Sequence, residues 1–240
     1  MCIRDRIQPG DTQRIRALAD RLGLAIGVET GARYLLDSRA KHAPNLLDEE
    51  ASGRDLRVDL HRRLIHLAAE LNAEYVSVWA GVAPGGQSTE SSWQYLSEGL
   101  QRTAEFARSE EVALSFEPEP GMFLETPRGY QELLDRFEGQ FDDLGLTLDV
   151  GHCLCTGDLP VSAVVRRYAG RLRAVHLDDI RDGLHEHLPL GEGELDLDDA
   201  LRSLREVGFA GLASVELSRD SHRGAEMARR SIERLRASAD

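Results

Sequence analysis

Two short segments, Leu144-Gly-Leu-Thr-Leu-Asp-Val150 and Leu172-Arg-Ala-Val-His-Leu177, decide the fold class of this chain. Both are mostly apolar and have apolar residues on both faces, as strands of a parallel sheet do when helices cover both of its faces. Between them, the apolar residues of segment 161–168 recur at the spacing of an amphipathic helix. The stretch therefore predicts a strand, a helix and a second strand parallel to the first.

The same alternation extends in both directions along the chain. Six strands are predicted, at residues 24–30, 74–80, 112–117, 144–150, 172–177 and 212–217. Apolar residues at helical spacing separate them, within residues 15–22, 56–71, 93–107, 130–137, 161–168, 201–207 and 225–235. This pattern allows a doubly wound sheet or a (β/α)₈ TIM barrel. No Gly-x-Gly-x-x-Gly follows an early strand, which disfavours the dinucleotide-binding sheet and favours the barrel. No linker interrupts residues 1–240, so a single domain is predicted.

Composition excludes several functions. The net charge of −13 disfavours nucleic acid as a partner, and no apolar stretch approaches the length of a membrane span. The first residues lack the apolar region of a signal peptide, and the three cysteines (Cys2, Cys153 and Cys155) suit reduced thiols, so we expect a cytoplasmic protein. Lys41 is the only lysine and no Gly-rich loop surrounds it, which disfavours Schiff-base, pyridoxal-phosphate and Walker chemistry.

Four predicted strands end in side chains that can bind a metal: Glu117, Asp149, His176 and Glu216. Strands of a parallel barrel end at one rim, so these side chains are expected to converge there. Three carboxylates that meet without a lysine would repel one another, and a divalent cation removes that repulsion. Three oxygen ligands and one imidazole favour Mn²⁺ or Mg²⁺, with Co²⁺ and Zn²⁺ as alternatives.

The residues from Val112 to Glu216 resemble the xylose isomerase-like TIM-barrel superfamily of sugar isomerases and epimerases, which also includes endonuclease IV-type enzymes. The matching motifs are Phe116-Glu-Pro-Glu-Pro-Gly121, Leu148-Asp-Val-Gly-His152, Val175-His-Leu-Asp178, Leu190-Gly-Glu-Gly-Glu194 and Val215-Glu216. Together they are specific for the superfamily but not for a substrate.

The resemblance implies roles for individual residues. Glu117, Asp149, His176 and Glu216 would be the metal ligands, and Glu117 and Glu216 would also act as acid and base on opposite faces of a carbohydrate. The reaction implied is epimerisation or isomerisation of a sugar, sugar phosphate or hydroxy-carbonyl compound through a metal-stabilised enediolate. One residue departs from the family pattern: Phe123 stands where some epimerases have an acid, which argues against a ketose epimerase.

Substrate contacts are predicted for four further residues: His152, His185, His187 and Trp79. His152 would hold a substrate oxygen, or it would contact the metal ligands without binding the metal itself. His185 and His187 fall in a predicted polar loop, where they would meet substrate, a further metal or only solvent. Trp79 would form a sugar-stacking wall, or be part of the core.

The remaining polar residues have weaker predictions. Glu119 is a second rim carboxylate, but strand alternation would direct it away from the side of Glu117. Lys41 and His42 would hold an anionic group or lie in a solvated loop. Structural roles are expected for His61, His66 and His222, and a soft-metal site at Cys153 and Cys155 is disfavoured.

Two other functions stay open. The first is a non-catalytic barrel with a binding or assembly role. The second is a metal-dependent phosphodiesterase of the endonuclease IV kind, which would need histidines on earlier strands. Residues 24–30 and 74–80 contain none, although a trinuclear metal count would favour this function again.

The sequence also predicts that the barrel is incomplete. The four candidate ligands resemble the residues at the ends of the family's fifth to eighth strands. The first predicted strand, residues 24–30, then corresponds to the third strand of the barrel, and residues 1–10 are too short to form a βα unit ahead of it. The opening Met1–Arg6 is unlike the family, so we expect a truncated chain that lacks two strands. The strands at Leu24 and Leu212 would then be unpaired edges, open to a partner or a second copy of the chain.

Overall fold

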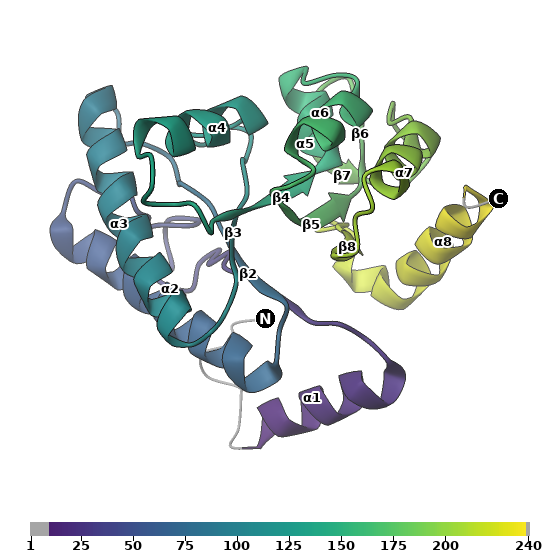
Figure 1. Ribbon diagram of the computed structural model, residues 1–240, viewed down its shortest axis with the longest axis horizontal. Helices are drawn as coiled ribbons and strands as arrows, with labels where there is room; N and C mark the ends of the chain where they lie inside the picture. The colour runs from purple at the N-terminus through teal and green to yellow at the C-terminus, as the bar shows by residue number, and fades with distance from the viewer. Residues whose placement is uncertain (1–9, 239–240) are drawn as a thin grey trace. The chain divides into compact units, whose positions relative to one another are not determined.

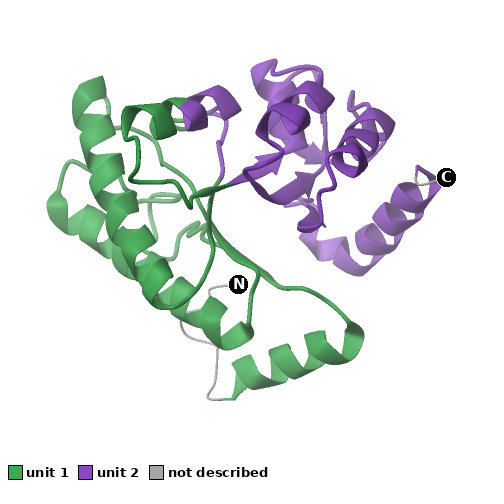
Figure 2. Ribbon diagram, viewed as in Figure 1, with its two compact units in different colours: residues 1–116, 121–124, 132–145 green, residues 117–120, 125–131, 146–240 purple. Residues whose placement is uncertain are grey.

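The structure is a computed structural model that describes residues 10–238. It forms two compact units, shown in Figure 2. The first unit contains residues 1–116, 121–124 and 132–145, and the second contains residues 117–120, 125–131 and 146–240. The prediction of a single domain stays a prediction.

The first unit alternates helices and strands in the predicted order (Figure 1). Its elements are α1 (Asp11–Leu22), β1 (Gly27–Glu29), α2 (Ala51–Leu71), β2 (Tyr75–Val78), α3 (Thr89–Ser109) and β3 (Leu114–Phe116). β1 pairs in parallel with β2, and β2 with β3, so that Val28, Val76 and Leu114 lie at one level of the sheet. All four residues of β2 are buried, in keeping with a sequence in which Ser77 is the one small polar residue beside Tyr75, Val76 and Val78.

Helix α4 (Pro127–Arg136) has residues in both units. Its start follows the sequence signal, because Thr126 Oγ1 accepts a hydrogen bond from Gly129 N at 3.0 Å ahead of Pro127. Strand β4 (Gly145–Asp149) likewise has its first residue in the first unit and the rest in the second.

The second unit continues with parallel strands and covering helices. Its elements after β4 are α5 (Val150–Thr156), α6 (Val161–Tyr168), β5 (Leu172–Leu177), β6 (Asp179–Arg181), β7 (Leu184–Leu188), α7 (Leu197–Glu206), β8 (Leu212–Val215), the 3₁₀ turn η2 (Ser221–Arg223) and α8 (Gly224–Ala237). β4 pairs in parallel with β5, and β5 with β8. Asp196 caps α7, since its Oδ1 accepts from Asp199 N at 3.0 Å.

Strand register positions the site. Asp149 of β4 lies directly opposite His176 of β5, and the end of β5 is level with Val215 of β8. Asp149 and His176 therefore leave the sheet at the same level. Glu216 comes one residue after β8, where its backbone N–H donates to the Leu177 carbonyl at 3.1 Å.

Four elements within residues 10–238 were missed by the sequence prediction: the strands β6 and β7, the short helix α5 and the turn η2. The segment with His185 and His187, predicted as a polar loop, is the antiparallel hairpin of β6 and β7. Asp182 and Gly183 form its turn, with φ of 54° and 65°, and Asp-Gly was the available signal for a hairpin turn. The short helix α5 begins directly at the end of β4, too short for helical periodicity to show.

The α/β class and the six predicted parallel strands are confirmed. Among the described residues, no helix has the length and apolar character needed to cross a bilayer. The predictions that the first residues are too short for a βα unit and unlike the family concern residues 1–9, which lie outside the described part of the chain. The truncation and the unpaired strand edges stay predictions.

Candidate metal centre

The second unit brings together the four side chains that end predicted strands. One ligand atom each from Glu117, Asp149, His176 and Glu216 lies within 4.8 Å of the other three. We call these residues the four-ligand group. Glu117, Asp149 and His176 are 5%, 2% and 3% exposed, whereas the Glu216 side chain is 38% exposed. Three of the four side chains are thus buried, and solvent reaches the group at Glu216.

His176 lies at the centre of this group. Its Nδ1 is 3.0 Å from Glu117 Oε1 and also 3.0 Å from Glu216 Oε2. One ring nitrogen cannot donate a single proton fully to two carboxylates. The two carboxylate oxygens and the imidazole nitrogen are close enough together to bind one cation.

Asp149 supplies a free, buried oxygen. Its Oδ1 accepts a hydrogen bond from His152 N at 2.8 Å and so caps α5, but its Oδ2 is buried without any hydrogen-bond partner in the described structure. A buried carboxylate oxygen that lacks a partner is costly unless a ligand satisfies it. This orphaned oxygen and the oxygen-rich donor set fit a hard divalent cation.

The pKa values of the group reflect burial and neighbouring charge. Burial, followed by the charge of Asp178, raises the pKa of Asp149. Burial alone would also raise the pKa of Glu216, but the hydrogen bond and charge of His176 outweigh it and lower that pKa to about 2. Glu216 is therefore ionised at neutral pH.

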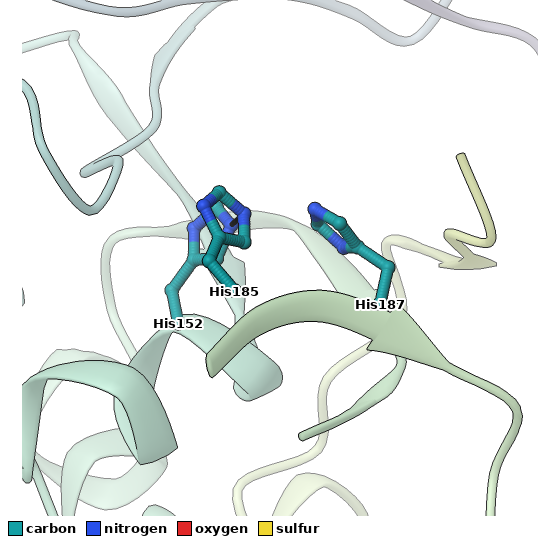
Figure 3. A group of neighbouring side chains, drawn as sticks. All are labelled: His152, His185 and His187. Atoms are coloured by element: carbon teal, nitrogen blue, oxygen red, sulfur yellow. Dashed lines mark hydrogen bonds between the residues drawn. The ribbon is translucent and has the colours of Figure 1, made fainter. Parts of the chain in front are cut away.

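Three of the predicted substrate residues form a second cluster, the three-histidine group of His152, His185 and His187 (Figure 3). His152 projects from α5, and the other two project from β7. His152 Nε2 and His185 Nε2 are 3.0 Å apart, and the ring centres of His185 and His187 are 4.6 Å apart. His185 and His187 reach the same side because alternate residues of a strand share a face.

Burial and neighbouring imidazoles keep His152 neutral. Burial, followed by the charges of His185 and His187, lowers the pKa of His152 to about 3. Its Nδ1 lies 3.1 Å from the Pro118 carbonyl oxygen, which accepts the ring proton and leaves Nε2 as the atom that faces His185.

Glu119 lies near both clusters, which corrects the prediction that strand alternation turns it away. One ligand atom each from Glu117, Glu119 and His152 lies within 4.8 Å of the other two. The alternation argument was wrong, because residues i and i+2 of a strand share a face, so alternation would have placed Glu119 on the side of Glu117. In addition, β3 ends at Phe116, so neither glutamate is a strand residue. Burial, followed by the charges of Glu117, Asp149 and Glu216, raises the pKa of Glu119 to about 8.

Trp79 belongs to the first unit and has its own partners there. It is 7% exposed, its ring meets His42 edge-on at 5.2 Å, and the Arg57 guanidinium lies over it at 4.6 Å. A sugar-stacking role for Trp79 stays a prediction. Cys153 is buried and Cys155 partly buried, both as free thiols, and among the described residues neither joins a group that could hold a metal.

The chain belongs to the family described as "Xylose isomerase-like TIM barrel", whose sequence pattern matches residues 3–238. The resemblance seen in the sequence is thereby confirmed, and so is the TIM-barrel class of the fold.

Three similar proteins illustrate the family. L-ribulose-5-phosphate 3-epimerase UlaE of Shigella flexneri is 25% identical over 89% of this chain and 73% of its own length. Inosose dehydratase of Clostridium tetani is 24% identical over 56% of this chain, which spans about half (50%) of that enzyme. A solved D-tagatose 3-epimerase-like protein superposes with a TM-score of 0.75 at 23% identity, over 97% of this chain and 86% of the other. The structural likeness concerns the fold alone.

Proposed function

We propose that this protein is a metal-dependent isomerase or epimerase that acts on a small carbohydrate or related hydroxy-carbonyl compound. The observation that carries the proposal is the four-ligand group, in which three carboxylates converge on His176 and Asp149 keeps a buried oxygen without a partner. The epimerase and dehydratase names of the relatives support a substrate of this class.

Glu117, Asp149, His176 and Glu216 would hold a divalent cation, with Mn²⁺ or Mg²⁺ favoured by the oxygen-rich set. When bound, such an ion supplies Lewis-acid stabilisation of the negative charge that develops on a substrate oxygen.

The carboxylates of the chain would move the proton. Glu216 is ionised and is the most exposed of the four, so it can meet a substrate C–H and accept its proton. Glu117 is the second carboxylate of the pair, with its Oε1 held 3.0 Å from His176 Nδ1. Return of the proton to the same carbon from the opposite face gives an epimer, and return to the neighbouring carbon gives an isomer.

The three-histidine group would bind the polar part of the substrate. Imidazole nitrogens can donate to, or accept from, hydroxyl groups, and His152 and His187 are 4% and 9% exposed. Burial of these rings limits the water that competes for the same hydrogen bonds.

Metal analysis combined with isotope exchange tests this function. The purified protein is assayed for bound metal, then incubated in deuterated water with a panel of ketoses, aldoses and their phosphates. We expect one divalent ion per chain and exchange of one carbon-bound hydrogen in a member of the panel. Bound metal without any exchange would instead support a non-catalytic barrel with a binding role.

A second candidate is a metal-dependent phosphodiesterase of the endonuclease IV kind. The observation that favours it is the three-histidine group, a metal-capable cluster beside the four-ligand group. The net charge of −13 opposes nucleic-acid binding. Three ions per chain together with cleavage of an abasic-site DNA duplex would favour this candidate over the isomerase.

A further inference from the structure

Asp178 is a buried carboxylate that none of the proposed chemistry uses. It lies between β5 and β6, and none of its surface is exposed. Its neighbour Asp179 is also buried, but that carboxylate accepts three backbone N–H groups, from Ile180, Gly191 and Leu195, and so has an evident structural role in its own loop. Asp178 differs because only one of its oxygens serves the backbone.

The first oxygen of Asp178 holds the start of α5. Asp178 Oδ1 accepts a hydrogen bond from Gly151 N at 3.1 Å. A Cβ at position 151 would lie 2.2 Å from this oxygen, so the close approach requires glycine. Gly151 stands between Asp149 of the four-ligand group and His152 of the three-histidine group. Asp178 therefore fixes the turn that carries both residues.

The second oxygen faces the hairpin. Asp178 Oδ2 is 2.7 Å from Nδ1 of His187, and both atoms are buried. Neither atom has a hydrogen-bond partner among the described residues, and one ligand atom each from Asp149, Asp178 and His187 lies within 4.8 Å of the other two. The 2.7 Å separation of Asp178 Oδ2 and His187 Nδ1 is a hydrogen-bonding distance, so a proton carried by Nδ1 would face the carboxylate.

This contact sets the direction of the His187 ring. With Nδ1 toward Asp178, Nε2 lies on the other side of the ring, and the ring centre of His187 is 4.6 Å from His185 and 5.6 Å from His152. A carboxylate beside one ring nitrogen places the proton there and leaves the other nitrogen with a lone pair.

We propose that Asp178 is a positioning residue that keeps the proton of His187 on Nδ1 and leaves Nε2 unprotonated within the three-histidine group. The proposal deepens the proposed function, because it says how one of the substrate-facing imidazoles is oriented. Asp178 acts through His187 and has no part in proton transfer itself.

The test measures the tautomer directly. Protein labelled with ¹⁵N-histidine is examined by long-range ¹H–¹⁵N NMR at pH 8, and the His187 signals are identified by their loss in His187→Gln. We expect the Nδ1–H tautomer in the wild type. In Asp178→Asn the side-chain amide can still accept from Gly151 N but donates toward His187, so the proton should move to Nε2. Asp182→Asn, an exposed change in the hairpin turn, should leave the wild-type tautomer.

Activity gives a second readout. If the protein exchanges a carbon-bound hydrogen, Asp178→Asn should lower that rate by about 10–100-fold, the usual effect of a lost ligand-orienting partner, while Asp182→Asn stays within about 2-fold of the wild type. Absence of exchange in the wild type would defeat the proposed function and leave the NMR test intact.

Three NMR outcomes would overturn the proposal: an Nε2–H tautomer in the wild type, a doubly protonated His187 at pH 8, or the same tautomer in the wild type and Asp178→Asn. If Asp178→Asn fails to fold, as judged by circular dichroism, the wild-type tautomer decides alone.

Discussion

Arg57 of the first unit and Asp149 of the second are both buried ionisable side chains, with 1% and 2% of their surface exposed. The Arg57 guanidinium donates to the carbonyl oxygens of Pro44, Thr30 and His42, at 2.9, 3.4 and 2.5 Å, and lies over the Trp79 ring. Asp149 has a backbone donor on one oxygen and none on the other within the described residues.

The difference separates a structural charge from a binding charge. Arg57 has every nitrogen directed at a backbone carbonyl, so its burial orders segment 30–44 and needs nothing further. One oxygen of Asp149 is held by a hydrogen bond and the other has none, and the neighbouring carboxylates further disfavour its charged form. A buried charge that the protein itself leaves unsatisfied indicates a site for a ligand.

The largest effect is expected at Glu216 in the second unit. Glu216→Gln keeps the size of the side chain but cannot accept a proton. The rate at which the substrate found in the panel exchanges its carbon-bound hydrogen with deuterated water should therefore fall by about 10²–10⁴-fold. Glu226→Gln, on the exposed face of α8, is the matched control and should leave the rate unchanged. Exchange at the wild-type rate in Glu216→Gln would show that Glu216 is not the base.

Arg57→Met should cause the largest loss of stability in the first unit. The change leaves three backbone carbonyls without their donor, and a buried acceptor left unsatisfied costs about 1–3 kcal/mol of unfolding free energy. Urea denaturation followed by circular dichroism measures it. Arg63→Met, on the exposed side of the same helix, should cost less than about 0.5 kcal/mol. Equal losses of unfolding free energy in the two variants would contradict a structural role for Arg57.

Removal of metal should destabilise the second unit. A ligand present at 100 times its Kd contributes about 2.7 kcal/mol to the folded state, so EDTA should lower the melting temperature of the metal-loaded protein. Asp149→Asn removes one negative charge, so this variant should respond less to EDTA and melt higher than the wild type once both are metal-free. An unchanged wild-type melt, with metal loss verified by elemental analysis, would contradict a bound ion.

Buried carboxyls of the second unit should govern the pH response of the metal-free protein above pH 6.5, whereas below it the half-buried His42 and the buried His152 oppose them. Burial, followed by neighbouring carboxylates, raises the pKa of Glu119 to about 8, and burial raises the pKa of Asp178 to about 7. The folded state then binds these protons more tightly than the unfolded state, so stability rises as pH falls from about 8 toward 4. Burial, followed by the charges of Lys41, Arg57 and Arg33, lowers the pKa of His42 to about 4, so its contribution is lost as pH falls below about 6.5.

Between pH 8 and 6.5 only the carboxyl contribution acts, and the melting temperature should rise by a few degrees. Glu119→Gln should flatten this rise, whereas His42→Gln should alter the profile only below pH 6.5. Differential scanning calorimetry over pH 5–8 measures both. A wild-type melting temperature that falls between pH 8 and 6.5 would contradict the shifts assigned to the buried carboxyls.

Regular, repeated features of the chain were predictable without coordinates. Apolar runs predicted all six parallel strands, because a strand covered on both faces is mostly apolar. The four-ligand group followed from the same pattern: parallel strands end at one rim, so polar residues at their ends meet. Its convergence in the second unit agrees with that expectation, and the role of its members as ligands is the proposal to be tested.

Irregular segments were decided only by the tertiary structure. Helix α5 and the β6–β7 hairpin are too short to show a period, so the meeting of His152 with His185 and His187 could not be read from their spacing. The contact between Asp178 and His187 depends on how closely the hairpin approaches the end of β5. Sequence alone thus determined which residues lie at or next to the strand ends, because side-chain burial repeats along a strand. Tertiary structure decided which loop side chains join them, because loop geometry is set by packing between segments that lie far apart in the chain.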